Sequence, residues 1–160
     1  MFLFYKDTKF KEACDIGFEN FSRYKKDEEF ISLYALSCLE VDYINRLAKP
    51  IAILRNSKES RANSAYFSVI LMQKKLLYHA MIDGYDLSSL KLPTTKYILS
   101  KVFDLYLQLG KHLQKDRYLF KDSTDSRLSY KLYLIKNNNI QKIVIEELYN
   151  SKIIKIHTYW

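Results

Sequence analysis

Residues 128–160 read LSYKLYLIKNNNIQKIVIEELYNSKIIKIHTYW. Apolar and polar residues alternate along this stretch, which is the period of half-buried strands. Asn137-Asn138-Asn139 and Asn150-Ser151 interrupt the alternation with residues that tolerate positive φ, as turns require. The stretch therefore predicts a three-stranded antiparallel meander with strands at Leu128–Lys136, Ile140–Tyr149 and Ile153–Trp160. In the first of these strands, Leu128, Tyr130, Leu132 and Leu134 share one face.

Before about residue 117 the apolar residues recur at helical spacing instead. Asp7 or Thr8 is a suitable N-cap for the first helix and Ser57 for the fourth, and Gly84 and Gly110 are suitable stops. Pro50 predicts a kink or a break in the third helix near Ala48 and Lys49. About five helices are expected, at Lys9–Phe21, Asp27–Val41, Tyr43–Leu54, Lys58–Asp83 and Pro93–Leu109.

These patterns predict the α+β class, with N-terminal antiparallel helical hairpins followed by the meander. The length suits a single domain over residues 1–160, with a helical part at 9–110 and a β part at 117–160. The polar segment 111–125 reads as irregular, with a short strand at Tyr118–Lys121 as the alternative.

Two classes of function find no support in the sequence. No window of about 18 apolar residues occurs, so no membrane-spanning helix is expected. With three Gly and no CxxC pair, the chain lacks phosphate-cradling and zinc motifs, so we expect no cofactor, no metal and no enzymatic activity. His79, His112 and His157 lie far apart in sequence; acid–base chemistry by His79 with Asp83 is the remaining enzymatic hypothesis.

The net charge of +8 arises entirely from residues 56–160. Residues 1–55 carry nine basic and nine acidic side chains, whereas residues 117–160 carry eight and four. No dense basic run forms. A solvated surface, an acidic protein partner, nucleic acid and an anionic membrane surface all agree with this distribution.

Cys14 and Cys38 lie on the apolar faces of the first two predicted helices. If these helices fold back on each other, the two residues face one another and a disulfide is geometrically reasonable. Two buried free thiols are the alternative. A bridge implies a periplasmic or secreted protein, and its absence implies a cytoplasmic one. Met1–Lys6 is either the remnant of a removed leader or a native start docked on the first helix.

Aromatic residues are frequent on the predicted strands. They alternate with lysines, and three interpretations fit: cross-strand packing, a protein-binding patch and a base-stacking surface. The last strand is also a candidate edge for a partner strand. The candidate surface residues are Tyr130, Tyr133, Tyr149, Tyr159, Trp160, Lys131, Lys142 and Lys155.

Residues 9–55 carry Ile16-Gly17 in the first helix and the small residues Ala35 and Cys38 in the second. In this they resemble tetratricopeptide and related helical-hairpin repeats, which pack a Leu-Gly pair against small residues of the next helix. Asn20 stands where that family has a tyrosine. The resemblance implies a protein-interaction scaffold and brings no catalytic residue with it.

The sequence thus favours a non-enzymatic protein-interaction or scaffold module of bacterial type. The alternative is a nucleic-acid-binding protein that uses a basic, tyrosine-rich sheet face.

Overall fold

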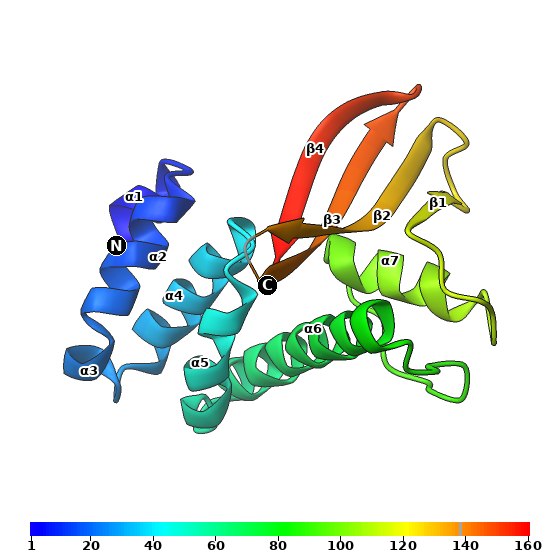
Figure 1. The fold of residues 1–160 in the computed structure, drawn as a ribbon. Coiled ribbons are helices and arrows are strands. Elements are labelled where there is room, and N and C mark those ends of the chain that lie inside the picture. Colours follow the sequence, from blue (N-terminus) through cyan, green and yellow to red (C-terminus); the bar gives the residue numbers. More distant parts are fainter. Residues whose placement is uncertain (138) are drawn as a thin grey trace. The chain divides into compact units, whose positions relative to one another are not determined.

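Helices occupy the first part of the chain and an antiparallel sheet the last part (Figure 1). The computed structural model describes residues 1–137 and 139–160. Their α+β class agrees with the sequence, but seven α-helices and four strands replace the expected five and three. The helices are α1 Phe2–Lys6, α2 Phe10–Glu19, α3 Phe21–Tyr24, α4 Glu28–Glu40, the 3-10 helix η1 Ile44–Leu47, α5 Ala48–Ile53, α6 Lys58–Asp83 and α7 Ile98–Leu107. The strands are β1 Arg117–Lys121, β2 Leu128–Asn137, β3 Ile140–Tyr149 and β4 Lys152–Tyr159.

Two compact units make up the chain, Met1–Leu71 and Met72–Trp160. The division falls inside α6, whereas the expected helical and β parts were divided by type of secondary structure. Each unit is described separately below.

In the first unit, α2 and α4 form an antiparallel hairpin. Asp27 is the N-cap of α4, since its carboxylate accepts a hydrogen bond from the Phe30 N–H at 2.9 Å. Gly17 allows α2 to approach α4 closely: a Cβ at this position would lie 2.5 Å from the ring of Tyr34. Close approach buries an apolar core between the helices, including Ala13, Cys14, Ile31, Tyr34, Ala35 and Cys38.

The third expected helix is divided into η1 and α5, with the change of helix type at Leu47–Ala48. Pro50 lies in the first turn of α5, where its missing N–H costs no intrahelical bond. Helix α6 begins as expected, because Ser57 Oγ accepts from the Ser60 N–H at 2.9 Å. Glu28 accepts from the main-chain N–H groups just before α6, and these bonds lower the pKa of Glu28 to about 2.

Several helix boundaries differ from the expectation. Lys9, and not Asp7 or Thr8, is the N-cap of α2, and α3 lies where a polar link was expected. The apolar N-terminus forms α1, and its Tyr5 ring packs edge-on against Phe10 at 5.3 Å. Helix α7 starts at Ile98 rather than Pro93, because Tyr97 has an extended conformation with ψ of 141°. Gly84 and Gly110, the predicted stops, have positive φ angles of 70° and 62°.

The sheet of the second unit has the strand order β1-β2-β3-β4, with antiparallel neighbours throughout. The predicted meander is therefore present, extended by the short strand that was the alternative at 118–121. Asn139, Asn150 and Ser151 have positive φ, as the two predicted turns require; Asn138 lies outside the described residues.

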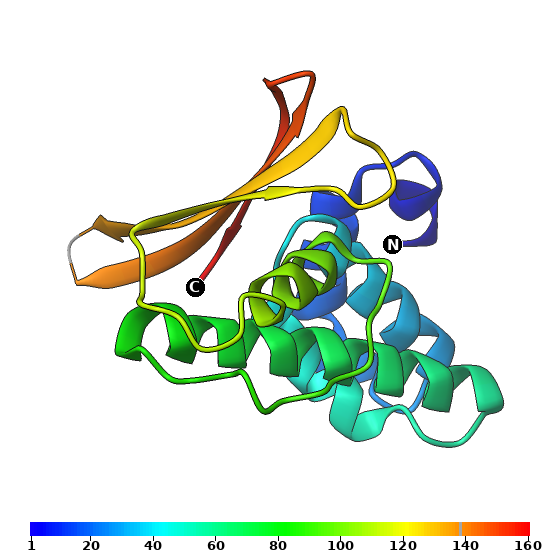
Figure 2. The same ribbon diagram turned by 90° about the vertical axis from the view of Figure 1, so that its right-hand side faces the viewer.

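One face of the sheet, here called the inner face, packs against α7 (Figure 2). It carries the buried residues Tyr118, Phe120, Tyr130, Leu132, Ile143, Ile145, His157 and Tyr159. Leu132, Ile145 and His157 form one cross-strand row of this face. The Tyr118 ring lies 5.2 Å from that of Tyr106 on α7.

The opposite face, here called the outer face, holds the alternate residues. It carries Arg117, Leu119 and Lys121 from β1, Ser129, Lys131, Tyr133 and Ile135 from β2, Lys142, Val144, Glu146 and Leu148 from β3, and Ile153, Ile156, Thr158 and the adjoining Trp160 at β4. The ladder between β3 and β4 contains a bulge: Leu148 pairs with Ile153 and Glu147 with Lys155, so that Ile154 is the extra residue.

Candidate interaction surface

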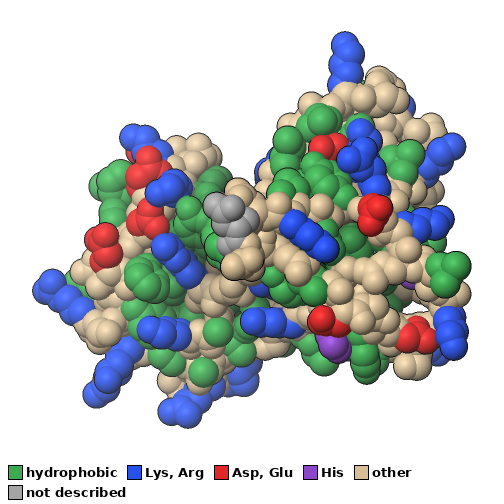
Figure 3. Space-filling view, viewed as in Figure 1, with side chains coloured by type: hydrophobic (Ala, Val, Ile, Leu, Met, Phe, Trp, Pro, Cys, Tyr) green, Lys and Arg blue, Asp and Glu red, His purple; other side chains and the backbone are tan. Residues whose placement is uncertain are grey.

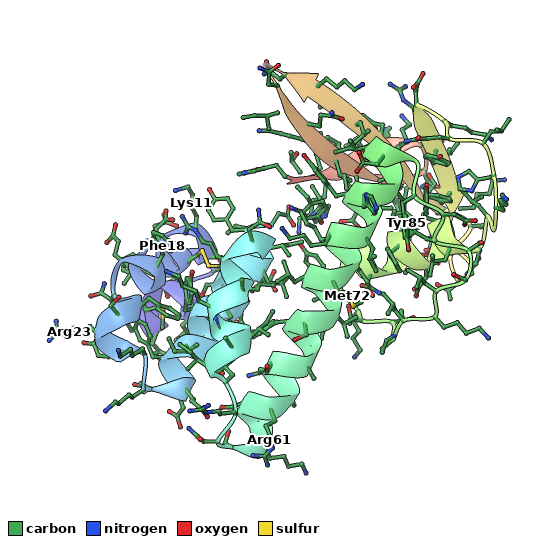
Figure 4. The ribbon with its side chains drawn as sticks, turned by 60° about the horizontal axis from the view of Figure 1, so that its bottom comes forward. Lys11, Phe18, Arg23, Arg61, Met72 and Tyr85 are labelled. Carbon is green, nitrogen blue, oxygen red and sulfur yellow. A yellow bond between two sulfur atoms is a disulfide. The ribbon has the colours of Figure 1, made fainter. Side chains whose placement is uncertain are left out.

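Cys14 and Cys38 form a disulfide between α2 and α4, with their Cα atoms 4.8 Å apart (Figure 4). Both side chains are fully buried and pack with Tyr34. The bridge joins the two helices at the place that the hairpin prediction gave.

Arg46 from η1 lies beside the bridge. Its Nη1 donates to Asp15 Oδ1 at 2.8 Å and lies 3.1 Å from Cys14 Sγ. Lys11 and Arg46 together lower the pKa of Asp15. These contacts tie η1 to α2 and account for Arg46 without a ligand.

Two of the eight surface candidates are core residues. Tyr130 and Tyr159 each expose only 1% of their surface, because both lie on the inner face. Tyr130 OH donates to Asp122 Oδ2 at 2.5 Å, and Tyr159 OH donates to the hydroxyl of Tyr97 at 3.3 Å. Both rings therefore belong to the core and not to the exposed surface of the sheet.

Tyr149 and Lys155 also belong to the inner side of the sheet. Tyr149 pairs with Leu128 and lies under the Arg127 guanidinium at 5.0 Å. Lys155 is exposed and stands opposite Glu147. These two are accessible to different degrees, but they do not share a face with the other candidates.

The remaining four candidates come together on the outer face. Lys131 Nζ lies 3.5 Å from Glu146 Oε2, and Tyr133 OH donates to Glu146 Oε1 at 2.8 Å. At the end of the sheet, Lys142 Nζ lies 4.6 Å from the centre of the Trp160 ring, a cation–π distance. The structure thus brings Lys131, Tyr133, Lys142 and Trp160 onto one surface.

Aliphatic side chains complete this surface, and sequence reasoning did not select them. Leu119 is 64% exposed and Ile156 is 55% exposed, at the two ends of a row that runs through Lys131 and Glu146. Ile135 and Ile153 are 43% and 50% exposed. Alternation alone could not identify them, because it does not say which face of the sheet the helices cover.

The inner face has a polar network that is structural. The buried Asp122 carboxylate accepts bonds from Lys101 Nζ at 2.6 Å and from Thr124 Oγ1 at 2.6 Å, besides that of Tyr130. These bonds, that of Lys101 first, hold the pKa of Asp122 far below its ordinary value. The network closes the connection from β1 to β2 and ties it to α7.

Two further contacts of titratable side chains stabilise the position of β4. His157 Nε2 lies 2.8 Å from Glu147 Oε1, and this contact lowers the pKa of Glu147. Burial lowers the pKa of Lys74 to about 8; its Nζ donates to the main-chain oxygen of Trp160. Both contacts tie β4 to its surroundings.

His79 forms an exposed pair with Asp83 (2.8 Å) and stacks on Tyr85 at 4.5 Å. A cavity of about 140 Å³ is lined by Tyr85, Tyr106 and His112, among other residues. Neither His79 nor Asp83 lines it. The geometry that an acid–base site at His79 needs is therefore not provided by this cavity.

Comparisons with protein-family models, characterised proteins and solved structures gave no match to this chain. Within residues 1–137 and 139–160, no helix has both the length and the apolar character that crossing a bilayer requires. The same residues contain no group of three or more His, Cys, Asp or Glu side chains placed to hold a metal ion.

Proposed function

We propose that this protein is a non-enzymatic interaction module that binds another protein through the outer face of its sheet. The observation that carries the proposal is the set of exposed aliphatic side chains on that face. Large apolar patches on a protein surface are typical of binding sites. Figure 3 shows hydrophobic side chains interspersed with Lys and Arg over the strands.

The chemistry of the patch favours a protein over a nucleic acid. Bases stack on flat rings, and the outer face offers only Tyr133 and Trp160, both engaged by side chains beside them. Its most exposed members are Leu119, Ile153 and Ile156. Branched aliphatic side chains fit the apolar residues of a protein partner and have no flat surface on which a base could stack.

The charges of the face indicate an acidic partner. Arg117 and Lys121 flank Leu119 on β1, Lys131 and Lys142 lie on β2 and β3, and Glu146 is the acidic member of the face. Lys131 pairs with Glu146, so the face keeps a net positive charge. A face of this kind favours a partner that presents carboxylates among apolar side chains.

The test is capture of interacting proteins from the native source by the immobilised protein. Leu119→Glu places a carboxylate on the outer face, and we expect it to reduce capture of specific partners at least tenfold. Leu113→Glu is the matched control, since Leu113 is 88% exposed and lies outside the strands. Equal capture by both variants would contradict the proposal.

Nucleic-acid binding is the second candidate, because two cations of the outer face lie next to aromatic rings. The Arg117 guanidinium lies 5.2 Å from the centre of the Tyr133 ring, and Lys142 Nζ lies 4.6 Å from the centre of the Trp160 ring. If phosphates bound here, affinity for a labelled single-stranded oligonucleotide would fall steeply between about 50 and 200 mM salt. Absence of binding at low salt excludes this function.

Export to an oxidising compartment belongs to the same proposal. The disulfide distance between Cys14 and Cys38 supports it, since such bridges persist mainly outside the cytosol. Blocking free thiols during lysis and weighing the intact chain tests it: an unmodified, bridged mass supports export, and two blocked thiols contradict it.

A further inference from the structure

The outer edge of β4 is the strongest candidate for a more specific mode of binding. In the strand order β1-β2-β3-β4, β4 pairs with β3 on one side, and no strand of the described residues lies on its other side. It has eight residues, against five in the opposite edge strand β1. A strand edge of this kind is a template for an added strand.

We propose that this edge pairs with an extended segment of the partner in which apolar and acidic residues alternate. The inference rests on the proposed function and names how the partner binds. Main-chain hydrogen bonds would supply affinity, and the side chains of β4 would select the sequence.

Register gives β4 two chemically distinct sides. Ile153 stands opposite Leu148 and Ile156 opposite Glu146, which places both isoleucines on the outer face. Lys152 stands opposite Tyr149 and Lys155 opposite Glu147, which places both lysines on the inner side. Without the bulge, residues 153 and 156 would lie on opposite faces, because side chains alternate. The extra residue Ile154 thus produces an apolar side and a cationic side along one exposed edge.

All five residues from Lys152 to Ile156 are exposed. An added strand that leaves Ile154 unpaired, as β3 does, keeps the same alternation, so its side chains next to Ile153 and Ile156 must be apolar. Those next to Lys152 and Lys155 must carry the opposite charge. The segment that fits has a carboxylate at every second position and a branched aliphatic residue between them.

Charge also decides against a second copy of β4 as the occupant. The strand contains two lysines and no acidic residue. Two copies paired about a two-fold axis would bring the lysines of one near those of the other with no compensating carboxylate. Like charges across a strand pair are destabilising.

Fluorescence anisotropy with the full oxidised chain tests the inference. The probe is a labelled seven-residue peptide that alternates Glu and Val. We expect saturable binding, and Lys155→Glu should weaken it at least tenfold while creating binding to the corresponding Lys-Val peptide. Lys96→Glu is the control of equal charge, since Lys96 is exposed and lies in the segment before α7. It should change the affinity less than twofold.

Two N-methylated peptides separate strand pairing from contact by side chains alone. One is methylated at the Glu positions and the other at the Val positions. In a paired strand successive N–H groups point to opposite sides, so only one of the two peptides should lose binding. Because these probes leave the protein unchanged, their result does not depend on how well a variant folds.

Absence of peptide binding at millimolar concentration would overturn the inference, as would equal binding by both methylated peptides. Sedimentation velocity of the protein alone tests whether a second copy occupies the edge. A dimer whose dissociation constant changes in Lys155→Glu would overturn the occupant proposed here. Displacement of the bound peptide by phosphatidylserine vesicles, but not by unlabelled acidic peptides, would also overturn it. If Leu119→Glu abolishes capture but the peptides do not bind, the outer face binds a partner without strand addition, and only this inference fails.

Discussion

The two compact units differ in how they are stabilised and in what they leave exposed. Residues 1–71 pack helices on both sides of a disulfide and carry eleven basic and ten acidic side chains. Residues 72–160 carry fifteen basic and eight acidic side chains and form a sheet with helices on its inner face. A nearly neutral unit with a cross-link and a basic unit with an open sheet face indicate that stability and binding depend on different residues.

Removal of the disulfide should have the largest effect. The bridge spans 24 positions in sequence, and closing a loop of that length stabilises a fold by about 3 kcal/mol. We expect a Cys14→Ala, Cys38→Ala variant to lose about this much in urea unfolding followed by circular dichroism at 222 nm. Trp160 is the only tryptophan and lies in the second unit, so its fluorescence transition should shift less. Equal shifts would show that the two units unfold together.

Asp122 offers the corresponding test of the second unit. Asp122→Ala removes a buried acceptor from Lys101, Thr124 and Tyr130, and we expect a loss of about 2–3 kcal/mol in urea unfolding.

The same carboxylate predicts the pH dependence. Because the pKa of Asp122 is lower in the folded chain than in the unfolded one, its contribution is complete above about pH 4 and is lost as pH falls. Asp122→Asn should therefore lose less stability than the parent between pH 5 and pH 2. If the parent and Asp122→Asn lost the same free energy of unfolding between pH 5 and pH 2, the assigned network would be contradicted.

Gly17→Ala tests the close approach of α2 and α4. The added Cβ would meet the Tyr34 ring at 2.5 Å, and overpacking of this kind costs about 2 kcal/mol. Gly110→Ala is the comparison in the second unit: nothing lies within 4 Å of the added Cβ, but φ is +62°. It should cost about 1 kcal/mol through backbone strain alone. Thermal unfolding of both variants would measure the difference.

The N-cap of α4 should have a smaller effect. Asp27→Ala removes the bond to the Phe30 N–H, and loss of such a cap costs about 1 kcal/mol. Asp27→Asn retains the acceptor and should cost less than half as much in urea unfolding. A similar cost for both substitutions would point to the charge rather than the hydrogen bond.

Substitutions on the outer face should affect stability least. Leu119→Ser and Ile156→Ser should change the free energy of unfolding by no more than about 0.5 kcal/mol, since both side chains are already exposed. Destabilisation by 2 kcal/mol or more, measured by urea unfolding, would show that these side chains are part of the core.

The sequence allowed the helix and strand periods and the cap at Ser57 to be identified. It also placed Cys14 and Cys38 on facing helices, but left a disulfide and two free thiols as alternatives. Local chemistry determines these features. The face of each strand that the helices cover depends on packing between distant segments. For that reason Tyr130 and Tyr159 were mistaken for surface residues, and Leu119 and Ile135 were overlooked.

Strand β1 and helix α1 were difficult to predict from the sequence for a related reason. β1 has only five residues and is held by pairing with β2, so its local pattern was weak. α1 also has five residues, too few for a periodic signal. Its order comes from packing of Tyr5 and Met1 on the neighbouring helices.

The extra residue in β4 also determines which changes of chain length the sheet can accept. On either side of Ile154 the pairing with β3 is already continuous, from Leu148–Ile153 to Glu147–Lys155. Deleting Ile154 would therefore leave every other residue of the strand opposite its present partner. Deleting Ile156 would instead force a change of partners: either His157 and Tyr159 turn to the opposite face, or Ile154 and Lys155 take the places opposite Glu147 and Glu146. Natural relatives of this chain that differ in length within β4 should accordingly lack the residue at 154.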